Sequence, residues 1–224
     1  MLKVGIAGFG GMGHNHLGCY EKVEGAELVA LADVVEEKLR PGKSEVEINI
    51  GTGGGTVDPE RHSLYSSANE LIADPDIDMV DICLPSYLHA EYAVKALEAG
   101  KHVLSEKPMA LTYEDCQKIL RAVEESGLQY MTAQVVRFFP QYEYLKETVD
   151  SGRLGPLTQL SMWRACSKPD WSGAGWYQDH KLSGGGIIDL HVHDVDFLHH
   201  LLGRPRALSS SGCRGYTGGW DIVD

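Results

Sequence analysis

The sequence lacks the features of a disulfide-rich or zinc-binding protein. Its five cysteines are odd in number and far apart, and no Cys-x-x-Cys pair occurs. Free thiols in a reducing, cytoplasmic environment are therefore expected. Histidine pairs occur at His14-x-His16, His191-x-His193 and His199-His200, all in or beside predicted helices. Residues two apart on a helix do not face each other, so we predict no metal site.

Long apolar stretches and runs of positive charge are also missing. No segment is apolar over enough residues to span a bilayer, and the chain enters a strand-like run at Leu2 without a signal peptide. The net charge is −12 with no run of Lys and Arg, which argues against nucleic acid and anionic membrane surfaces as partners. The 224 residues are 43% hydrophobic, enough for one large domain or two small ones.

The N-terminal half alternates strand-like and helix-like segments. Short apolar runs typical of buried strands occupy residues 2–9, 27–34, 79–84, 102–105 and 130–133. Apolar residues at helical spacing predict helices over residues 12–24, 87–100 and 113–125. This alternation predicts an α/β fold with a doubly wound parallel sheet over residues 1–133.

A glycine-rich turn lies between the first predicted strand and the first predicted helix. Its G-x-G-x-x-G pattern consists of Gly8, Phe9, Gly10, Gly11, Met12 and Gly13. The first glycine of such a pattern permits a tight turn, the second lets backbone approach a pyrophosphate, and the third lets the helix pack on the strand. Asp33 ends the second strand, where an acid binds a ribose 2′-hydroxyl. The arrangement predicts a Rossmann domain that binds a dinucleotide.

The residues after Asp33 bear on which dinucleotide is bound. A carboxylate repels a 2′-phosphate, and Val34 and Val35 supply no positive charge to bind one. We therefore predict NAD rather than NADP. The next segment, residues 36–63, is polar, and no apolar helix follows its glycines at 51–56. We expect a surface loop near the cofactor there.

A second polar constellation follows three glycines at residues 184–186. Asp189 and His193 are four residues apart and Asp196 follows three later, so one continuous helix would carry all three on one face. The opposite, apolar face would pack on the body of the protein and contains Val192, Val195, Leu198 and Leu202. A histidine between two carboxylates is a candidate proton acceptor, because its ordinary pKa is about 6.5. The alternative is a solvated helix face.

Four motifs occur in order along the chain. They are residues 8–16 (Gly-Phe-Gly-Gly-Met-Gly-His-Asn-His), residues 81–85 (Asp-Ile-Cys-Leu-Pro) with His89, residues 100–108 (Gly-Lys-His-Val-Leu-Ser-Glu-Lys-Pro), and the glycines at 184–186 with Asp189, His193 and Leu-Leu-Gly at 201–203. Together they resemble the glucose–fructose oxidoreductase / inositol dehydrogenase / MocA family. The resemblance implies an NAD-dependent oxidoreductase that acts on a sugar or an inositol-like cyclic polyol.

The resemblance also implies roles for single residues. In Glu106-Lys107-Pro108 the lysine would lie beside the nicotinamide and the substrate hydroxyl, and the bond before the proline would be cis. His193 would be the catalytic acid/base, and Asp189 would bind or orient substrate hydroxyls. Lys107, Asp189 and His193 are therefore the expected catalytic residues.

Further residues extend the two expected binding sites. Leu84, Pro85, His89, Glu106, Pro108 and Arg137 join the cofactor site by the same resemblance. Arg137 would touch cofactor or substrate, or pair with an acid. Trp176, with its neighbour Tyr177, resembles an aromatic wall over the substrate, with plain packing as the alternative. Asp196 would hold His193, or serve as a capping or surface residue.

Residues 134–224 are expected to form an α+β substrate domain. Family members continue after the Asp189 helix through a large, mostly antiparallel sheet that often makes the oligomer interface. This chain offers one expected strand, at residues 207–216, and stops at Asp224. We therefore expect a truncated sheet whose exposed edge favours a homo-oligomer. His191 stands where the family often has glycine.

Three functions agree with these features. The first is an NAD-dependent dehydrogenase of a sugar or polyol, with a small molecule as its partner. The second is a non-catalytic, cofactor-binding regulator, against which the joint presence of Lys107, Asp189 and His193 argues. The third is an NAD-dependent glycosidase, which would cleave a glycoside without net NADH. Fold analogy alone does not choose among them.

Overall fold

The computed structural model describes residues 1–41, 55–164, 173–214 and 221–223. The chain divides into two compact units. The first unit comprises Met1–Ala133 with Trp171–Trp176, and the second comprises Gln134–Asp170 with Tyr177–Asp224. Each is described below by itself.

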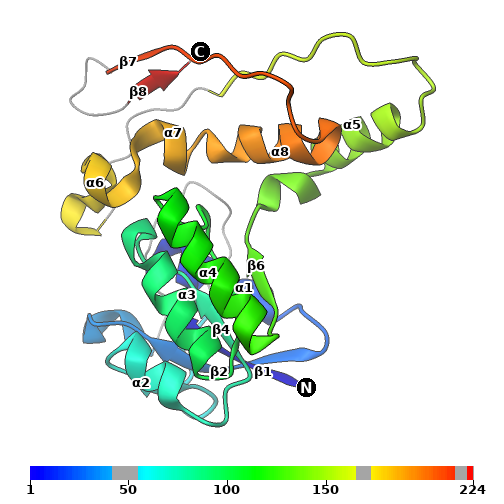
Figure 1. Ribbon diagram of the computed structural model, residues 1–224. Coiled ribbons are helices and arrows are strands. Elements are labelled where there is room, and N and C mark those ends of the chain that lie inside the picture. Colours follow the sequence, from blue (N-terminus) through cyan, green and yellow to red (C-terminus); the bar gives the residue numbers. More distant parts are fainter. Residues whose placement is uncertain (42–54, 165–172, 215–220, 224) are drawn as a thin grey trace. The chain divides into compact units, whose positions relative to one another are not determined.

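A parallel sheet of six strands forms the centre of the first unit (Figure 1). Its strand order is β3-β2-β1-β4-β5-β6, and every pairing is parallel. The strands are β1 (Leu2–Ala7), β2 (Ala26–Ala32), β3 (Ser63–Tyr65), β4 (Met79–Ile82), β5 (His102–Ser105) and β6 (Tyr130–Thr132). The order reverses between β1 and β4, and at such a switch point ligands bind beyond the carboxyl ends of the strands. The doubly wound sheet predicted from the sequence is confirmed.

Helices alternate with these strands along the chain. They are α1 (Gly11–Tyr20), η1 (Glu36–Leu39), α2 (Ala68–Ala73), η2 (Ser86–Leu88), α3 (His89–Glu98) and α4 (Tyr113–Ser126). The side chain of Thr112 accepts a hydrogen bond from the Asp115 amide and so caps the start of α4. Gly127 ends α4 in the left-handed conformation that glycine adopts most readily.

The pleat of the strands sorts apolar side chains onto the two faces of the sheet. Val4 and Ile6 of β1 pack in a cluster with Leu17 of α1, whereas Ala7 belongs to a cluster that includes Leu71 of α2. Successive strand residues point to opposite faces, so one alternating pattern supplies both clusters. Helix α1 therefore covers one face of the sheet, and α2, α3 and α4 cover the other.

The expected surface loop over residues 36–63 is wrong in part. Residues 42–54, including the alternating piece at 45–50, lie outside the described residues. Leu39 and Val57 are buried in the same cluster as Leu17, and a Cβ on Gly55 would stand 2.6 Å from the Leu17 side chain. Both ends of the segment thus pack against α1. The short elements β3 and α2 were not predicted, because neither is long enough to show a clear period.

The second unit is mostly helical where it is described. Its elements are η3 (Val135–Phe138), α5 (Pro140–Asp150), α6 (His180–Ser183), α7 (Gly185–Asp189), α8 (Val192–Leu202), β7 (Gly212–Arg214) and β8 (Asp221–Val223), and η4 (Gly173–Gln178) precedes α6 along the chain. Strands β7 and β8 pair antiparallel, so the expected single strand at 207–216 is shorter and has a partner. A small cluster of Val136, Phe197 and Leu201 forms its buried core.

The helix expected to carry Asp189, His193 and Asp196 is broken. The His191 amide donates to the Gly186 carbonyl, five residues back, instead of to the residue four back. As a result α7 ends at Asp189 and α8 begins at Val192. The predicted apolar face is also wrong: Val195 and Leu202 are about half exposed, while α8 buries Asp194, Phe197 and Leu201.

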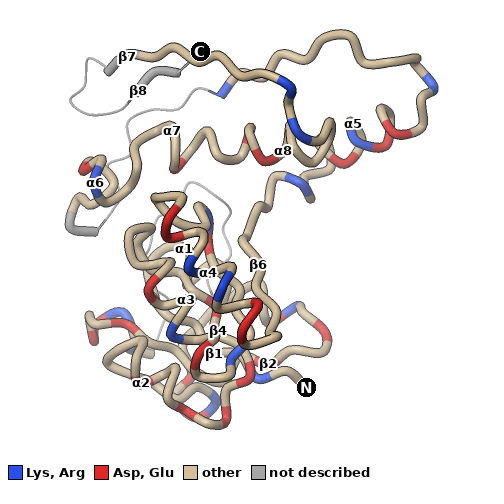
Figure 2. Tube along the Cα trace, in the orientation of Figure 1, with Lys and Arg blue, Asp and Glu red and all other residues tan. Residues whose placement is uncertain are grey.

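Charge is distributed along both units without a basic cluster at any described helix, as Figure 2 shows. Oppositely charged neighbours pair within helices, as Lys146 and Asp150 do in α5. Among the helices that the structure describes, none combines the length and apolar composition needed to cross a membrane.

Candidate functional site

The glycine turn after β1 has the geometry of a phosphate-binding turn. Gly8 has φ +94°, and a Cβ there would lie 2.7 Å from the Cys83 carbonyl oxygen. A Cβ on Gly13 would lie 2.3 Å from the Gly8 carbonyl oxygen. Around Gly10, by contrast, a Cβ would meet nothing within 4 Å. The first and third glycines are thus required by close packing, and the second borders open space at the start of α1.

That open space fits a pyrophosphate. The first amides of a helix have no partner within the helix and favour a negative charge. Gly10 is the residue before α1 and makes no side-chain cap, so backbone alone lines the approach. The residues present therefore fit the phosphates of a dinucleotide.

Asp33, directly after β2, faces this turn. One of its carboxylate oxygens accepts a hydrogen bond from the Phe9 amide at 2.8 Å, and the other accepts one from the Val35 amide at 2.8 Å. Lys38 of η1 adds an ion pair, with Nζ 3.0 Å from Oδ2. Asp33 is thus held where sequence spacing placed it, beside the glycine turn.

Lys38 is a residue of this site that sequence analysis missed. Only Val34 and Val35 were considered as possible partners of a 2′-phosphate. The 3₁₀ turn of η1 returns a lysine to the carboxylate from five residues further along the chain. Its side chain is 41% exposed, so its ammonium group can also reach a ligand.

The segments after β4 and β5 supply the other expected cofactor residues. His89 places Nδ1 2.7 Å from the Pro108 carbonyl and Nε2 2.8 Å from the Leu84 carbonyl. It therefore ties the turn at Leu84 and Pro85 to Pro108, in the segment that carries Lys107. Burial lowers the pKa of His89, although the two carbonyl oxygens oppose this effect. The Lys107–Pro108 bond is cis, as the resemblance implied.

Glu106 is buried at the end of β5. One oxygen of its carboxylate accepts the Lys107 amide at 3.0 Å, and the other lies 3.2 Å from His16 Nε2. Burial alone would raise the pKa of Glu106, but His16 and then Lys107 outweigh that effect and lower it. Glu106 is therefore an ionised carboxylate, with one oxygen at His16 and the other at the Lys107 amide.

The expected residues of the second unit lie on two successive helices instead of one. Asp189 is buried at the end of α7, and His193 lies in the first turn of α8. Both oxygens of Asp196 bind the Arg137 guanidinium, at 2.7 and 2.5 Å. Of the alternatives for Arg137, the pair with an acid is the one that the structure contains.

A second arginine–carboxylate pair in this unit was not foreseen. Asp194 is buried on α8 and accepts two hydrogen bonds from Arg164, each 2.8 Å long. Trp176 belongs to the first unit, where its ring meets that of Tyr87 edge-on with centroids 6.4 Å apart. Tyr177 is grouped with the second unit.

Comparisons with known proteins agree with this geometry. The model of an oxidoreductase family with an NAD-binding Rossmann fold matches residues 2–134, and the model of the GFO/IDH/MocA C-terminal domain matches residues 142–221. The chain belongs to this family. The resemblance inferred from its motifs is confirmed.

Individual relatives include dehydrogenases and a hydratase. The inositol 2-dehydrogenase of Salmonella typhimurium is 29% identical over 90% of this chain and 54% of its own length. The 2,7-anhydro-N-acetylneuraminate hydratase of Escherichia coli is 33% identical over 62% of this chain and 37% of its own length. The crystal structure of scyllo-inositol dehydrogenase from Lactobacillus casei is 27% identical, with a TM-score of 0.68, and covers 91% of this chain and 55% of that one. This chain spans about half the length of the curated relatives that it matches.

Proposed function

We propose that this protein is an NAD-dependent oxidoreductase that transfers hydride between nicotinamide and a secondary alcohol of a sugar or an inositol-like polyol. The observation that carries the proposal is the glycine turn, in which close packing requires Gly8 and Gly13 while Gly10 borders open space beside Asp33. That arrangement suits the pyrophosphate and ribose of a dinucleotide. Membership of the family supports the reaction class.

The two halves of the chain divide the work in this proposal. Residues 1–133 bind the cofactor through the glycine turn, Asp33 and the segments after β4 and β5. Residues 134–224 supply the substrate domain. Cys19, Cys83 and Cys116 are free thiols among the described residues, in keeping with the proposed cytoplasmic location. The proposed homo-oligomer would form through the C-terminal sheet.

Three side chains carry the proposed chemistry. Bound nicotinamide supplies the hydride acceptor. His193 accepts the proton of the substrate hydroxyl, since an imidazole with a pKa near neutrality suits a general base. The Lys107 ammonium group binds beside the nicotinamide and donates a hydrogen bond to the substrate oxygen that loses the proton. Asp189 accepts hydrogen bonds from neighbouring hydroxyls and so orients the ring.

NAD is the proposed cofactor, because Asp33 is held by two backbone amides at the ribose position. A fixed carboxylate there favours a 2′-hydroxyl over a 2′-phosphate. Lys38 places a positive charge beside Asp33 and so reduces the preference for NAD over NADP.

One relative supports a second candidate function. The Escherichia coli relative is named as a hydratase, so this site can be considered for a reaction that ends without net oxidation. An NAD-dependent glycosidase would also catalyse a reaction without net oxidation. Such an enzyme would convert a sugar derivative at a saturating level of NAD while NADH stays constant.

The first experiment titrates the purified chain with NAD and NADP, and then screens sugars and polyols. Myo-inositol, scyllo-inositol, levoglucosan and aryl glycosides form the screen, with NADH absorbance and product chromatography both recorded. NADH formation on a polyol supports the dehydrogenase. Conversion without NADH supports the second candidate, whereas NAD binding without any conversion favours the non-catalytic regulator.

A further inference from the structure

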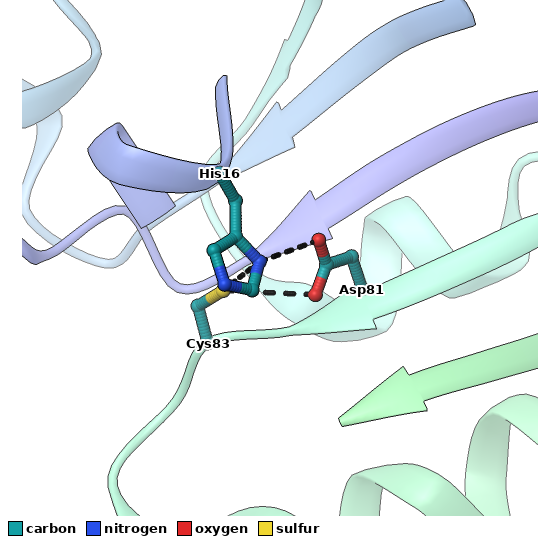
Figure 3. Close-up of side chains that lie close together, drawn as sticks. All are labelled: His16, Asp81 and Cys83. Atoms are coloured by element: carbon teal, nitrogen blue, oxygen red, sulfur yellow. Dashed lines mark hydrogen bonds and ion pairs between the residues drawn. The ribbon is translucent and has the colours of Figure 1, made fainter. Parts of the chain in front are cut away.

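Polar side chains from three segments meet on the face of the sheet that α1 covers. Figure 3 shows three of them, His16, Asp81 and Cys83. His16 of α1 places Nδ1 2.8 Å from an Asp81 oxygen in β4 and 3.4 Å from the Cys83 sulfur. Its other ring nitrogen, Nε2, lies 3.2 Å from Glu106 after β5. The Tyr20 hydroxyl donates to Asp81 at 3.0 Å. Apolar residues surround the strand positions on this face, so a polar cluster here requires an explanation.

The cluster contains two buried carboxylates and one group that can offset them. Asp81 is fully buried and Glu106 nearly so. A buried carboxylate is costly unless it is paired with a positive charge. His16 stands between the two, with one ring nitrogen toward each. An imidazolium has an N–H on both nitrogens and so can donate to both carboxylates, whereas a neutral ring can donate to only one.

Electrostatics favour that charged ring. Burial alone would lower the pKa of His16, but Cys83, Asp81 and Glu106 together raise it far above its ordinary value. Lys107 supplies a further positive charge near the cluster, beside Glu106. The phenol of Tyr20 stays protonated, because burial and Asp81 raise its pKa.

The cluster connects to the segment that carries Lys107. Glu106 uses one oxygen for His16 and the other for the Lys107 amide. On the other side of Lys107, the Pro108 carbonyl contacts His89. Lys107 therefore lies between two residues that each contact a histidine, the partly buried His16 and the buried His89. His16 contacts a carboxylate on each side, whereas His89 contacts two backbone carbonyls.

We propose that His16, as an imidazolium bridging Asp81 and Glu106, is a positioning residue that fixes the main chain presenting Lys107 to the nicotinamide. This role rests on the proposed function, because it matters only if Lys107 serves that ring. His16 touches no reacting atom in this account. It acts through Glu106 and the Lys107 amide.

A metal ion is the competing occupant. Ligand atoms of His16, Asp81 and Cys83 lie within 4.8 Å of one another, and their nitrogen, oxygen and sulfur are ligands that zinc accepts. Binding would require a thiolate and a deprotonated ring nitrogen. Burial and the nearby Asp81 raise the pKa of Cys83 to about 12, and the ring nitrogen already faces a carboxylate. The metal-free imidazolium is thus favoured, and metal binding becomes an outcome of the test.

The first measurement determines the state of the ring without any activity. ¹⁵N-histidine NMR of the full chain would be recorded from pH 6 to pH 9, with His16→Gln assigning the signal. We expect both ring nitrogens to stay protonated. His14 is the matched control on the same helix, since burial lowers its pKa and keeps its ring neutral. A singly protonated His16 ring would overturn the proposal, as would signals that shift when zinc or EDTA is added.

The second measurement separates a positioning role from a general structural one. Dissociation constants for NADH and for ADP-ribose, which lacks nicotinamide, are compared in wild type, His16→Gln and the control His14→Gln. We expect His16→Gln to weaken NADH about tenfold, the loss of one charge-assisted hydrogen bond, while ADP-ribose binding is unchanged. His14→Gln should affect both ligands alike. Equal weakening of both ligands by His16→Gln contradicts the proposal.

Two further results keep the outcomes distinct. Where His16→Gln fails to fold, Asp81→Asn removes one of the two charges that hold the imidazolium and should weaken NADH selectively as well. A wild-type chain that binds neither ligand overturns the proposed function and the role of Lys107 with it. A wild-type chain that binds NADH, with no selective loss in either variant, overturns the role of His16 alone.

Discussion

The first unit stabilises its sheet with apolar side chains on both faces, whereas the described part of the second unit has a small apolar core beside two arginine–carboxylate pairs. In the described part of the second unit the fully apolar core is Val136, Phe197 and Leu201. Beside it, α8 carries two acids that each bind an arginine. In the first unit the buried acids include Asp81 and Glu106 around His16, and Asp33 beside Lys38.

The first unit therefore serves as a rigid scaffold for the proposed cofactor site, while the second unit carries the proposed base. The carboxyl ends of rigid parallel strands hold the proposed cofactor residues, and such elements position groups more reproducibly than loops do. The proposed base, His193, stands on a helix whose neighbour α7 is only five residues long. Substitutions and changes of pH should therefore have different consequences in the two units, and five of these can be measured.

The largest effect is expected for the proposed base in the second unit. His193→Ala should lower turnover about 10²–10⁴-fold, the range for loss of a general base, and leave the dissociation constant for NAD unchanged. His199→Ala, at an exposed position on the same helix, is the control and should behave as wild type. Wild-type turnover in His193→Ala would contradict the assignment of the base.

The next effect concerns the small core of the second unit. Phe197→Ala removes the largest fully buried side chain of that core and should cost about 3–5 kcal/mol of stability. Hydrogen exchange should then show lost protection in residues 135–202, while β1 to β6 keep theirs. Leu202→Ala, about half exposed on the same helix, is the control. Equal loss of protection in both units would show that they unfold as one.

Much of the first unit could be predicted because its patterns are local. Strand β5 has the predicted bounds, and α4 ends one residue beyond its predicted end. The second unit was harder to predict, because the apolar spacing of α8 does not decide which of its side chains are buried. The apolar residues from Val192 to Leu202 have helical spacing. Asp194 is nevertheless buried, because its carboxylate pairs with an arginine thirty residues earlier in the chain. The apolar side chains of Val195 and Leu202 are about half exposed.

The glycine turn and the cluster at His16 also differ in how far the sequence predicts them. The G-x-G-x-x-G turn and Asp33 were found because their spacing is fixed by one strand–turn–helix unit. The cluster at His16 was not, since its members come from residues 16, 81, 83 and 106 and meet only when β1, β4 and β5 assemble. One signal was available: Asp81 is a carboxylate inside a strand that is otherwise apolar and buried, and such a residue needs a partner.

Acid should weaken the first unit more than the second. Burial lowers the pKa of His14, His62 and His89 in the folded state. The unfolded chain then binds protons that the folded chain does not, so stability falls as the pH drops below about 6.5, by up to about 1.4 kcal/mol per pH unit for each histidine. Hydrogen exchange at pH 7.0 and 5.5 should show protection lost mainly in residues 2–133.

His16 contributes with the opposite sign. Its pKa is raised in the folded state, so its stabilisation is fully present below about pH 6.5 and is lost as the pH rises toward the folded-state pKa. The stability difference between wild type and His16→Gln should therefore narrow between pH 7 and pH 9. A difference that stays nearly constant between pH 7 and pH 9 would mean that the ring is neutral in the folded protein.

The smallest effect is a change in cofactor choice within the first unit. Lys38 lies against Asp33 with its ammonium group partly exposed, so it supplies the charge that a 2′-phosphate would bind. Lys38→Met should weaken NADP about tenfold, equal to about 1.4 kcal/mol, and leave NAD binding nearly unchanged. Arg40→Met removes an exposed cation that pairs with Glu37 and is the control, with no change expected for either cofactor. If Lys38→Met binds NADP as wild type does, Lys38 only neutralises Asp33, and the preference for NAD rests on that carboxylate alone.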